Sequence, residues 1–304
     1  MPAFLDTVKK DWKRNAGLYV LVVPVLLFYA LFHYYPLYGA QIAFKQFIPT
    51  LGIWKSEWIG LRHFGDFFGS YYFWRILQNT LIISVISLVF GFPAPIIFAL
   101  MLNEVRNRGF KRSVQTITYM PHFISLVVIC GIIREFTRDD GAITAFLGGF
   151  GFRKVNMLSV PGLFVPIYVI SGIWQELGWG SIIYLAALAG IDPELYEASV
   201  MDGAGRFRQL WSITLPGILP TVMTLFILRM GRMLNVGYEK IILLYSPAIY
   251  ETADVISSFV YRKGLIDLNF SYSSAVGLFN GVVNLTLLVA ANRASRALGT
   301  TSLW

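Results

Sequence analysis

Long apolar stretches dominate the pattern of hydrophobic and polar positions along the chain. A helix needs roughly 20 residues to cross about 30 Å of hydrocarbon. Six stretches approach or exceed that length, and they cover residues 17–38, 78–102, 114–136, 162–190, 216–240 and 272–292. Charged and polar residues separate them. The pattern predicts an all-α integral membrane protein with six transmembrane helices.

Positively charged residues predict how these helices are oriented. Twelve Lys and Arg residues, among them Lys9, Arg106, Arg206 and Arg293, lie before the first stretch, in the second and fourth loops, and after the last stretch. Nine others are spread over the remaining loops, which are longer in total. Cytoplasmic loops retain an excess of Lys and Arg. The distribution therefore predicts that the N-terminus and the C-terminus both lie in the cytoplasm.

The N-terminal residues 1–16 form a separate segment. Phe4, Leu5, Val8 and Trp12 alternate there with lysines, as is typical of a helix in the membrane interface. A basic tail is the alternative interpretation. The apolar run from residue 18 to residue 37 is longer than the apolar region of a signal peptide. We therefore expect a cytoplasmic interfacial segment at 1–16 and one membrane domain at 17–304.

Composition excludes several other classes of protein. Hydrophobic residues make up 56% of the chain and charged residues 14%, with a mean hydropathy of +0.61, whereas soluble domains are about 25% charged. A soluble domain and a disordered chain are therefore both excluded. The single cysteine, Cys130, excludes a disulfide framework. The basic residues that give the chain its net charge of +8 flank the spans and form no soluble basic domain, so nucleic-acid binding is not indicated.

The fourth loop, residues 191–216, has the pattern of a folded hairpin. Asp192 is a good N-cap, Pro193 suits the first helical position, and Glu194 complements the positive end of the helix. Gly203 and Gly205 end this helix, and a second short helix is predicted at 206–213. The apolar surface of the hairpin predicts a protein partner; its members are Leu195, Tyr196, Val200, Met201 and Phe207.

The same loop carries a family resemblance. Glu197-Ala198-Ser199, then Gly203 after three residues and Ile213-x-Leu215-Pro216 after nine more, resembles the EAA motif of binding-protein-dependent ABC importer permeases. Ser199 replaces the more usual alanine. Residues 58–64, 79–80, 184–188 and 191–196 resemble the sugar branch of that family, which includes maltose-type and multiple-sugar permeases. Residues 115–125 and 250–255 resemble permeases for complex polysaccharide uptake in Gram-positive bacteria.

This resemblance implies a type I ABC importer permease in the bacterial cytoplasmic membrane, with residues 191–216 as the cytoplasmic coupling loop. The implied partners are a second homologous permease, two ATPase subunits and an extracytoplasmic solute-binding protein. The polysaccharide-like resemblance favours a paralogue as the second permease, giving a heterodimer. The residues implied to couple this chain to the ATPase are Glu197, Ala198, Ser199, Asp202, Gly203, Ile213, Leu215 and Pro216.

The chain itself is expected to be a transport subunit and not an enzyme. It has no Gly-x4-Gly-Lys-Ser/Thr loop to hold nucleotide phosphates. ATP and Mg²⁺ are therefore expected on the ATPase subunits, with no cofactor bound by this chain. The implied function is ATP-driven import of an oligosaccharide or polysaccharide, neutral or acidic, by alternating access.

Polar residues within the spans are candidates for the sugar path. Arg229 and Arg232 are expected on one face of the fifth span, and Glu176 lies in the fourth. Charges there indicate function, but a structural ion pair between Glu176 and one arginine is the favoured interpretation, and arginine side chains that extend to the membrane interface are a third. Helix packing likewise explains span amides. The full candidate set is Trp174, Gln175, Glu176, Arg229, Arg232, Asn235, Tyr238, Asn280 and Asn284.

Other residues in the spans favour structural roles. Gly277 and Gly281 predict close helix packing, and Glu239 with Lys240 is expected at the outer interface. Prolines at 93, 95, 121 and 220 predict bends.

Two other classes of function fit less well. A membrane-embedded enzyme would need convergent metal ligands or acids, but Asp202-Gly203-Ala204 lacks the further aspartates of a lipid phosphotransferase, and no two of the three histidines are spaced i, i+4. An ion-coupled secondary carrier or channel would need intramembrane acids, and only Glu176 is well placed. Neither class explains the hairpin. An ABC importer for a solute other than a sugar also remains an alternative.

Overall fold

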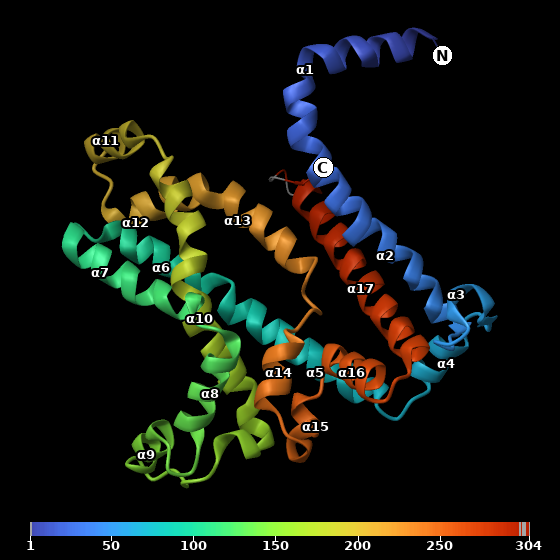
Figure 1. The fold of residues 1–304 in the computed structure, drawn as a ribbon. Helices are drawn as coiled ribbons and strands as arrows, with labels where there is room; N and C mark the ends of the chain where they lie inside the picture. Colours follow the sequence, from blue (N-terminus) through green and yellow to red (C-terminus); the bar gives the residue numbers. More distant parts are fainter. Residues whose placement is uncertain (1, 298, 300–301, 304) are drawn as a thin grey trace.

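The computed structural model describes residues 2–297, 299 and 302–303, and almost all of its regular structure is helical (Figure 1). Its one small sheet pairs β1 (Lys45–Gln46) with β2 (Glu57–Trp58) in antiparallel register, Lys45 opposite Trp58. The first helices are α1 (Pro2–Tyr29), η1 (Ala30–Tyr34), α2 (Tyr35–Leu37), η2 (Tyr38–Phe44), α3 (Gly52–Lys55), α4 (Arg62–Phe68), α5 (Phe73–Ile86), η3 (Ser87–Gly91) and α6 (Pro93–Glu104).

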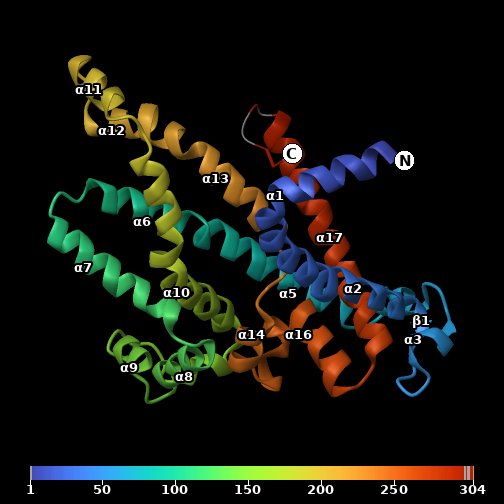
Figure 2. The same ribbon diagram turned by 45° about the horizontal axis from the view of Figure 1, so that its top comes forward.

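The remaining helices complete the membrane domain. They are α7 (Arg108–Tyr119), η4 (Met120–Phe123), α8 (Leu126–Thr137), α9 (Ala142–Gly148), η5 (Met157–Ser159), α10 (Pro161–Ala189), α11 (Pro193–Met201), α12 (Arg206–Gln209), η6 (Leu210–Thr214), α13 (Leu215–Met230), α14 (Tyr238–Leu244), η7 (Pro247–Ile249), α15 (Tyr250–Ala253), α16 (Ile256–Tyr261), η8 (Arg262–Ile266) and α17 (Phe270–Ala297). In both views α11 lies at one end of the molecule and α9 toward the other (Figure 2).

Four helices of the described residues are long and apolar enough to cross a membrane: Arg14–Phe44, Phe73–Glu104, Arg206–Met230 and Phe270–Ala297. A fifth candidate is a broken pair, Arg108–Phe123 and Leu126–Gly148, bent by 102°. The predicted spans 17–38, 78–102 and 272–292 lie inside the first, second and fourth of these helices. The predicted span 162–190 coincides with the 29-residue helix α10, whose middle carries the polar pair Gln175 and Glu176.

Two predicted spans differ from the structure. The predicted helix 216–240 ends at Met230, because Gly231 closes it and the backbone N–H of Leu234 donates to Asn284 Oδ1 at 2.9 Å instead of to a helical carbonyl. The predicted helix 114–136 is broken after Phe123. Pro121 lies in the 3₁₀ turn η4 at this break, and Ser125 Oγ then accepts from Val128 N at 3.4 Å to begin α8.

The other proline predictions agree with the structure in part. A π-helical segment, η3, ends two residues before Pro93 and loosens the helix there. Pro220 lies inside α13, which stays helical.

Helix α1 changes direction at Asn15, whose φ of −121° and ψ of 24° are not helical. Figure 1 shows the first part of α1 turned away from the part that runs beside α17. The predicted interfacial segment 1–16 ends next to this kink. Residue 1 and the side chains of Phe4, Leu5 and Val8 lie outside the described part of the structure. The helix after the kink is exposed on every side, as Leu21, Leu26 and Phe32 illustrate, which suits a surface covered by lipid or another subunit.

Helix α10 is the centre of the fold and packs against α6, α7 and α13. Contact with α7 is close at Gly178, where an added Cβ would collide with the backbone of Thr118. One apolar cluster joins α6, α10 and α13 around Ala99, Tyr184 and Ile218. A second joins α5, α8, α10 and α14 and includes Phe164. These contacts position α10 along the cavity described below.

Candidate functional site

The first helix and the turn of the hairpin at residues 191–216 are built as the sequence predicts, whereas the short helix predicted at 206–213 is the start of a helix that continues to Met230. Asp192 Oδ1 accepts from Glu194 N at 3.0 Å and caps α11, and Pro193 occupies the first turn. The chain reverses at Gly203, whose φ of +73° is in the left-handed region that favours glycine. The backbone N–H of Ala204 donates to Ser199 O at 2.9 Å and closes the end of α11. Figure 2 shows α11 projecting beyond the other helices.

Two side-chain hydrogen bonds join the two helices of the hairpin, and a third lies within α11. Ser199 Oγ donates to Tyr196 O at 2.8 Å and accepts from Gln209 Nε2 at 2.9 Å, which joins α11 to α12. The Tyr196 hydroxyl lies 3.0 Å from Thr214 Oγ1. Ser199, which stands where the motif usually has alanine, therefore links the two helices of the hairpin through a hydrogen bond that alanine could not form.

The outer surface of the hairpin is apolar and uncovered within this chain. Met201 is 87% exposed, Phe207 74% and Trp211 61%. Glu197, Ala198, Asp202 and Pro216 are also exposed, whereas Ile213 and Leu215 are partly buried. A continuous helix, Arg206–Met230, leads from this surface into the membrane domain.

A cavity of about 580 Å³ lies beside α10, between α5, α6, α13 and the segment 232–240. Five residues of the predicted sugar path line it: Gln175, Glu176, Arg229, Arg232 and Asn235. The other four, Trp174, Tyr238, Asn280 and Asn284, are not among its lining residues. The structure thus brings together the charged members of the predicted set.

The charged members do not pair as expected. No ion pair among the described residues joins Glu176 to an arginine; Glu176 Oε1 instead lies 3.4 Å from His122 Nδ1. The His122 ring stacks on Trp179 with centroids 4.5 Å apart. Arg229 is in the last turn of α13 and Arg232 lies in the turn beyond it. The prediction that the two arginines share one helix face is therefore wrong, because the helix ends between them.

The span amides serve mainly to hold the turn after α13. Asn235 Oδ1 accepts from Asn280 Nδ2 at 2.9 Å and from Asn284 Nδ2 at 3.0 Å. Asn284 is buried and also accepts from the backbone of Leu234. The packing interpretation therefore fits Asn284. The packing predicted for Gly277 and Gly281 is not formed within the described chain, since an added Cβ at either would meet nothing within 4 Å.

Lys240 is a cavity residue that sequence reasoning placed elsewhere. It is only 7% exposed, and its Nζ donates to Tyr168 O at 3.1 Å and lies 4.9 Å from the centroid of the Tyr168 ring. The predicted interfacial position is wrong because α14 folds back against α8. The sequence signal that could have shown the burial of Lys240 is the apolar run directly after it, Ile241-Ile242-Leu243-Leu244.

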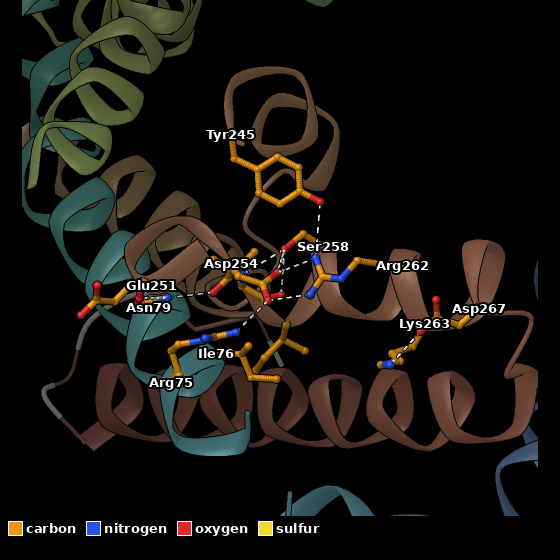
Figure 3. Close-up of polar contacts among 12 residues, drawn as sticks. Arg75, Ile76, Asn79, Tyr245, Glu251, Asp254, Ser258, Arg262, Lys263 and Asp267 are labelled. Carbon is orange, nitrogen blue, oxygen red and sulfur yellow. Dashed lines mark hydrogen bonds and ion pairs between the residues drawn. The ribbon is translucent and has the colours of Figure 1, made fainter. Parts of the chain in front are cut away.

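Asp254 forms a second charged cluster, which the sequence did not indicate (Figure 3). Its fully buried carboxylate accepts from Arg262 Nη1 at 3.1 Å, from Arg262 Nη2 at 2.7 Å and from Ser258 Oγ at 2.8 Å. Arg75 Nη2 lies 3.8 Å away. Burial disfavours the charged guanidinium of Arg262, but the hydrogen bonds and charge of Asp254 outweigh it and raise the pKa of Arg262 above its usual value.

The cluster fixes the segment 250–262 onto α5. Asn79 Nδ2 donates to the backbone carbonyls of Glu251 and Asp254, and Ile256 N donates to Thr80 Oγ1 at 2.9 Å. Among the described residues no group of three His, Cys, Asp or Glu side chains is arranged to hold a metal ion.

The chain is similar to permeases of known systems. It is 46% identical over 281 residues to protein LplB of Bacillus subtilis, covering 92% of this chain and 88% of LplB. It is 44% identical to YteP of the same organism, a polygalacturonan/rhamnogalacturonan transport system permease, covering 93% of this chain and 88% of YteP.

Solved structures agree with these relatives. A chain of a bacterial ABC transporter involved in the import of the acidic polysaccharide alginate is 45% identical, with a TM-score of 0.88 over 96% of this chain and 99% of that chain. The bacterial alginate ABC transporter in complex with its alginate pentasaccharide-bound periplasmic protein gives 0.89 at 44% identity over 97% and 99%.

The family model for the inner membrane component of binding-protein-dependent transport systems matches residues 91–298, which include the hairpin, the cavity-lining part of α10, and Asp254 with Arg262. The chain belongs to this family of inner membrane transport components.

Proposed function

We propose that this chain is the permease subunit of an ATP-driven ABC importer that moves an oligosaccharide or polysaccharide into the bacterial cytoplasm. The projecting hairpin with an uncovered apolar surface, placed as the EAA motif requires, is the observation that carries the proposal. The relatives that act on polygalacturonan, rhamnogalacturonan and alginate support a carbohydrate, with acidic sugars among the candidates.

The proposal includes six membrane spans with both termini in the cytoplasm. Helix α10 would supply the sixth span, because 29 residues rise about 43 Å. Its central Gln175 and Glu176 line the cavity and would not face lipid. In Figure 1 the start of α1 and the end of α17 lie toward the α11 side of the molecule, as this topology requires.

The proposed complex contains a second permease, a paralogue of this chain, and two ATPase subunits that bind ATP and Mg²⁺. An extracytoplasmic solute-binding protein delivers the sugar; the similar alginate importer has such a periplasmic protein. Glu197 is exposed on α11 and would meet a basic or hydrogen-bonding group of the ATPase. Closure of the ATPase pair would then move the hairpin and switch the spans between inward-facing and outward-facing states.

Purification in mild detergent tests the assembly. Tagged protein from its native host should retain an ATPase, a second permease and a binding protein, identified by mass spectrometry. Recovery of this chain alone would contradict the proposal and favour a self-sufficient carrier.

The variant Gly203→Val tests the coupling. The left-handed backbone at Gly203 disfavours a side chain by about 1–2 kcal/mol, and a β-branched one most strongly, so the turn between α11 and α12 should be distorted while the protein still inserts. Sugar uptake in proteoliposomes should fall at least tenfold relative to ATP hydrolysis. Gly151→Val is the matched control, since Gly151 also has positive φ and open space in a loop outside the hairpin. Unimpaired uptake by Gly203→Val would remove the coupling account.

A further inference from the structure

The three cations that line the cavity differ in their surroundings. Arg229 and Arg232 are exposed, whereas Lys240 is 7% exposed. The ammonium lies against Gly172 of α10, where an added Cβ would be 3.5 Å from Lys240 Nζ, in ordinary van der Waals contact. Lys240 is therefore the cation whose position is fixed by packing.

The ammonium of Lys240 has N–H groups that are available as hydrogen-bond donors. It has three N–H donors, and one of them is used by Tyr168 O. No ion pair of the described residues includes Lys240. Glu176 is the acid among the lining residues, and it lies against His122. The cavity lining thus carries Arg229, Arg232 and Lys240 against one carboxylate, a formal charge of +2 with His122 neutral.

We propose that Lys240 is a specificity-determining residue that pairs with the carboxylate of an acidic sugar as the sugar passes through the cavity. The inference rests on the proposed function and names the substrate class and the contact within it. A buried ammonium is costly without a counter-charge. A uronate supplies that charge and accepts the free donors, whereas a neutral sugar leaves the lysine unpaired. The difference favours acidic over neutral sugars in the cavity itself, separately from any choice made by a solute-binding protein.

A purely structural lysine makes a different prediction. If Lys240 only holds the Tyr168 carbonyl, its loss will weaken the fold or affect every substrate equally. If it pairs with substrate, the effect depends on substrate charge. Glu176→Gln, at a side chain that is 57% exposed, removes a negative charge from the lining and should act in the opposite direction.

The test uses the purified complex of this chain with its partner permease and ATPase subunits, without the solute-binding protein. Equilibrium dialysis measures the binding of trigalacturonate and of its neutral trimethyl ester, and melting temperature confirms that each variant is folded. We expect Lys240→Gln to lower the acid-to-ester affinity ratio about tenfold, Lys240→Arg to retain most of it, and Glu176→Gln to raise it. Lys263→Gln is the control: its lysine pairs with Asp267 outside the cavity, and its ratio should equal that of the unmodified complex.

Several results would overturn the inference. They are an unchanged ratio in Lys240→Gln, a ratio in Glu176→Gln that falls instead of rising, or no binding of trigalacturonate to the unmodified complex. Uptake by proteoliposomes that also contain the binding protein separates this failure from failure of the proposed function. ATP-dependent sugar uptake with an unaltered acid preference in Lys240→Gln would refute the lysine contact alone, whereas no ATP-dependent sugar uptake by the unmodified complex would refute the proposed function.

Discussion

The Asp254 cluster gives a sharp prediction for stability. Asp254→Asn keeps the shape of the side chain but removes the charge that two hydrogen bonds from Arg262 and the nearby Arg75 satisfy. Asp254 is fully buried, and the side chain of Arg262 is 20% exposed. Breaking one partner of a buried ion pair costs about 3–5 kcal/mol. Because the Arg262 side chain stays partly exposed to solvent, we expect a loss at the lower end of this range, about 3 kcal/mol.

The assay is thermal unfolding of the purified chain in detergent at a fixed heating rate. One kcal/mol shifts the melting temperature of a domain of 150–250 residues by about 2–4 °C, so Asp254→Asn should lower it by roughly 6–12 °C. Asp267→Asn is the matched control. It makes the same substitution in an ion pair with Lys263, 2.7 Å apart, in which both side chains are at least a third exposed. An exposed pair contributes at most about 1 kcal/mol, so a shift of at most about 4 °C is expected.

Equal melting temperatures for Asp254→Asn and Asp267→Asn would refute this reasoning, since burial would then have no effect on the value of the pair. The double variant Asp254→Asn/Arg262→Met adds a second test. Removing both charges leaves no unpaired guanidinium at position 262, and Arg75, which also loses its partner, is 29% exposed to solvent, so the double variant should melt above Asp254→Asn alone. A further fall would show that Arg262 stabilises the fold through contacts other than Asp254.

Two further predictions concern close contacts. Ser199→Ala should remove the hydrogen bond to Gln209, worth about 1 kcal/mol, and lower transport-coupled ATP hydrolysis in proteoliposomes severalfold. The control is Ser212→Ala, whose hydroxyl donates to a carbonyl of its own helix and whose loss should leave the rate of ATP hydrolysis unchanged. Equal rates for the two variants would contradict the role of Ser199. Gly178→Ala should reduce the yield of folded protein on size-exclusion chromatography, because its Cβ would collide with Thr118. Gly277→Ala, which meets nothing in this chain, should not, and a normal yield for Gly178→Ala would show that α7 can move aside.

Local signals made the hairpin predictable. Asp192, Pro193 and Gly203 each act on neighbouring backbone through a cap, a fixed φ or a positive φ. Spans such as 272–292 were predictable because apolar length alone defines them. These features depend on residues close together in the sequence.

The features that were not predicted depend on distant residues. Helix α13 ends at Met230 because Asn284, 50 positions after Leu234, takes the backbone N–H that would continue it. Lys240 and Asp254 occupy their sites through Tyr168 and Arg75, which are 72 and 179 positions away in the sequence. Hydropathy averages over a window and gives no information about such pairs.

The helix from Arg206 to Met230, continuous through the π-helical turn η6, has a mechanical consequence. It begins in the hairpin and ends at the cavity. The exposed apolar surface of the hairpin and Arg229 at the cavity therefore belong to one rod, about 37 Å long. A tilt of roughly 5° about the hairpin end would carry Arg229 sideways by about 3 Å, the length of a hydrogen bond. The rod is thus a lever, and hydrogen bonds among Asn235, Asn280 and Asn284 hold the turn that follows it against α17. Any force applied at the hairpin would reach the cavity and α17 together.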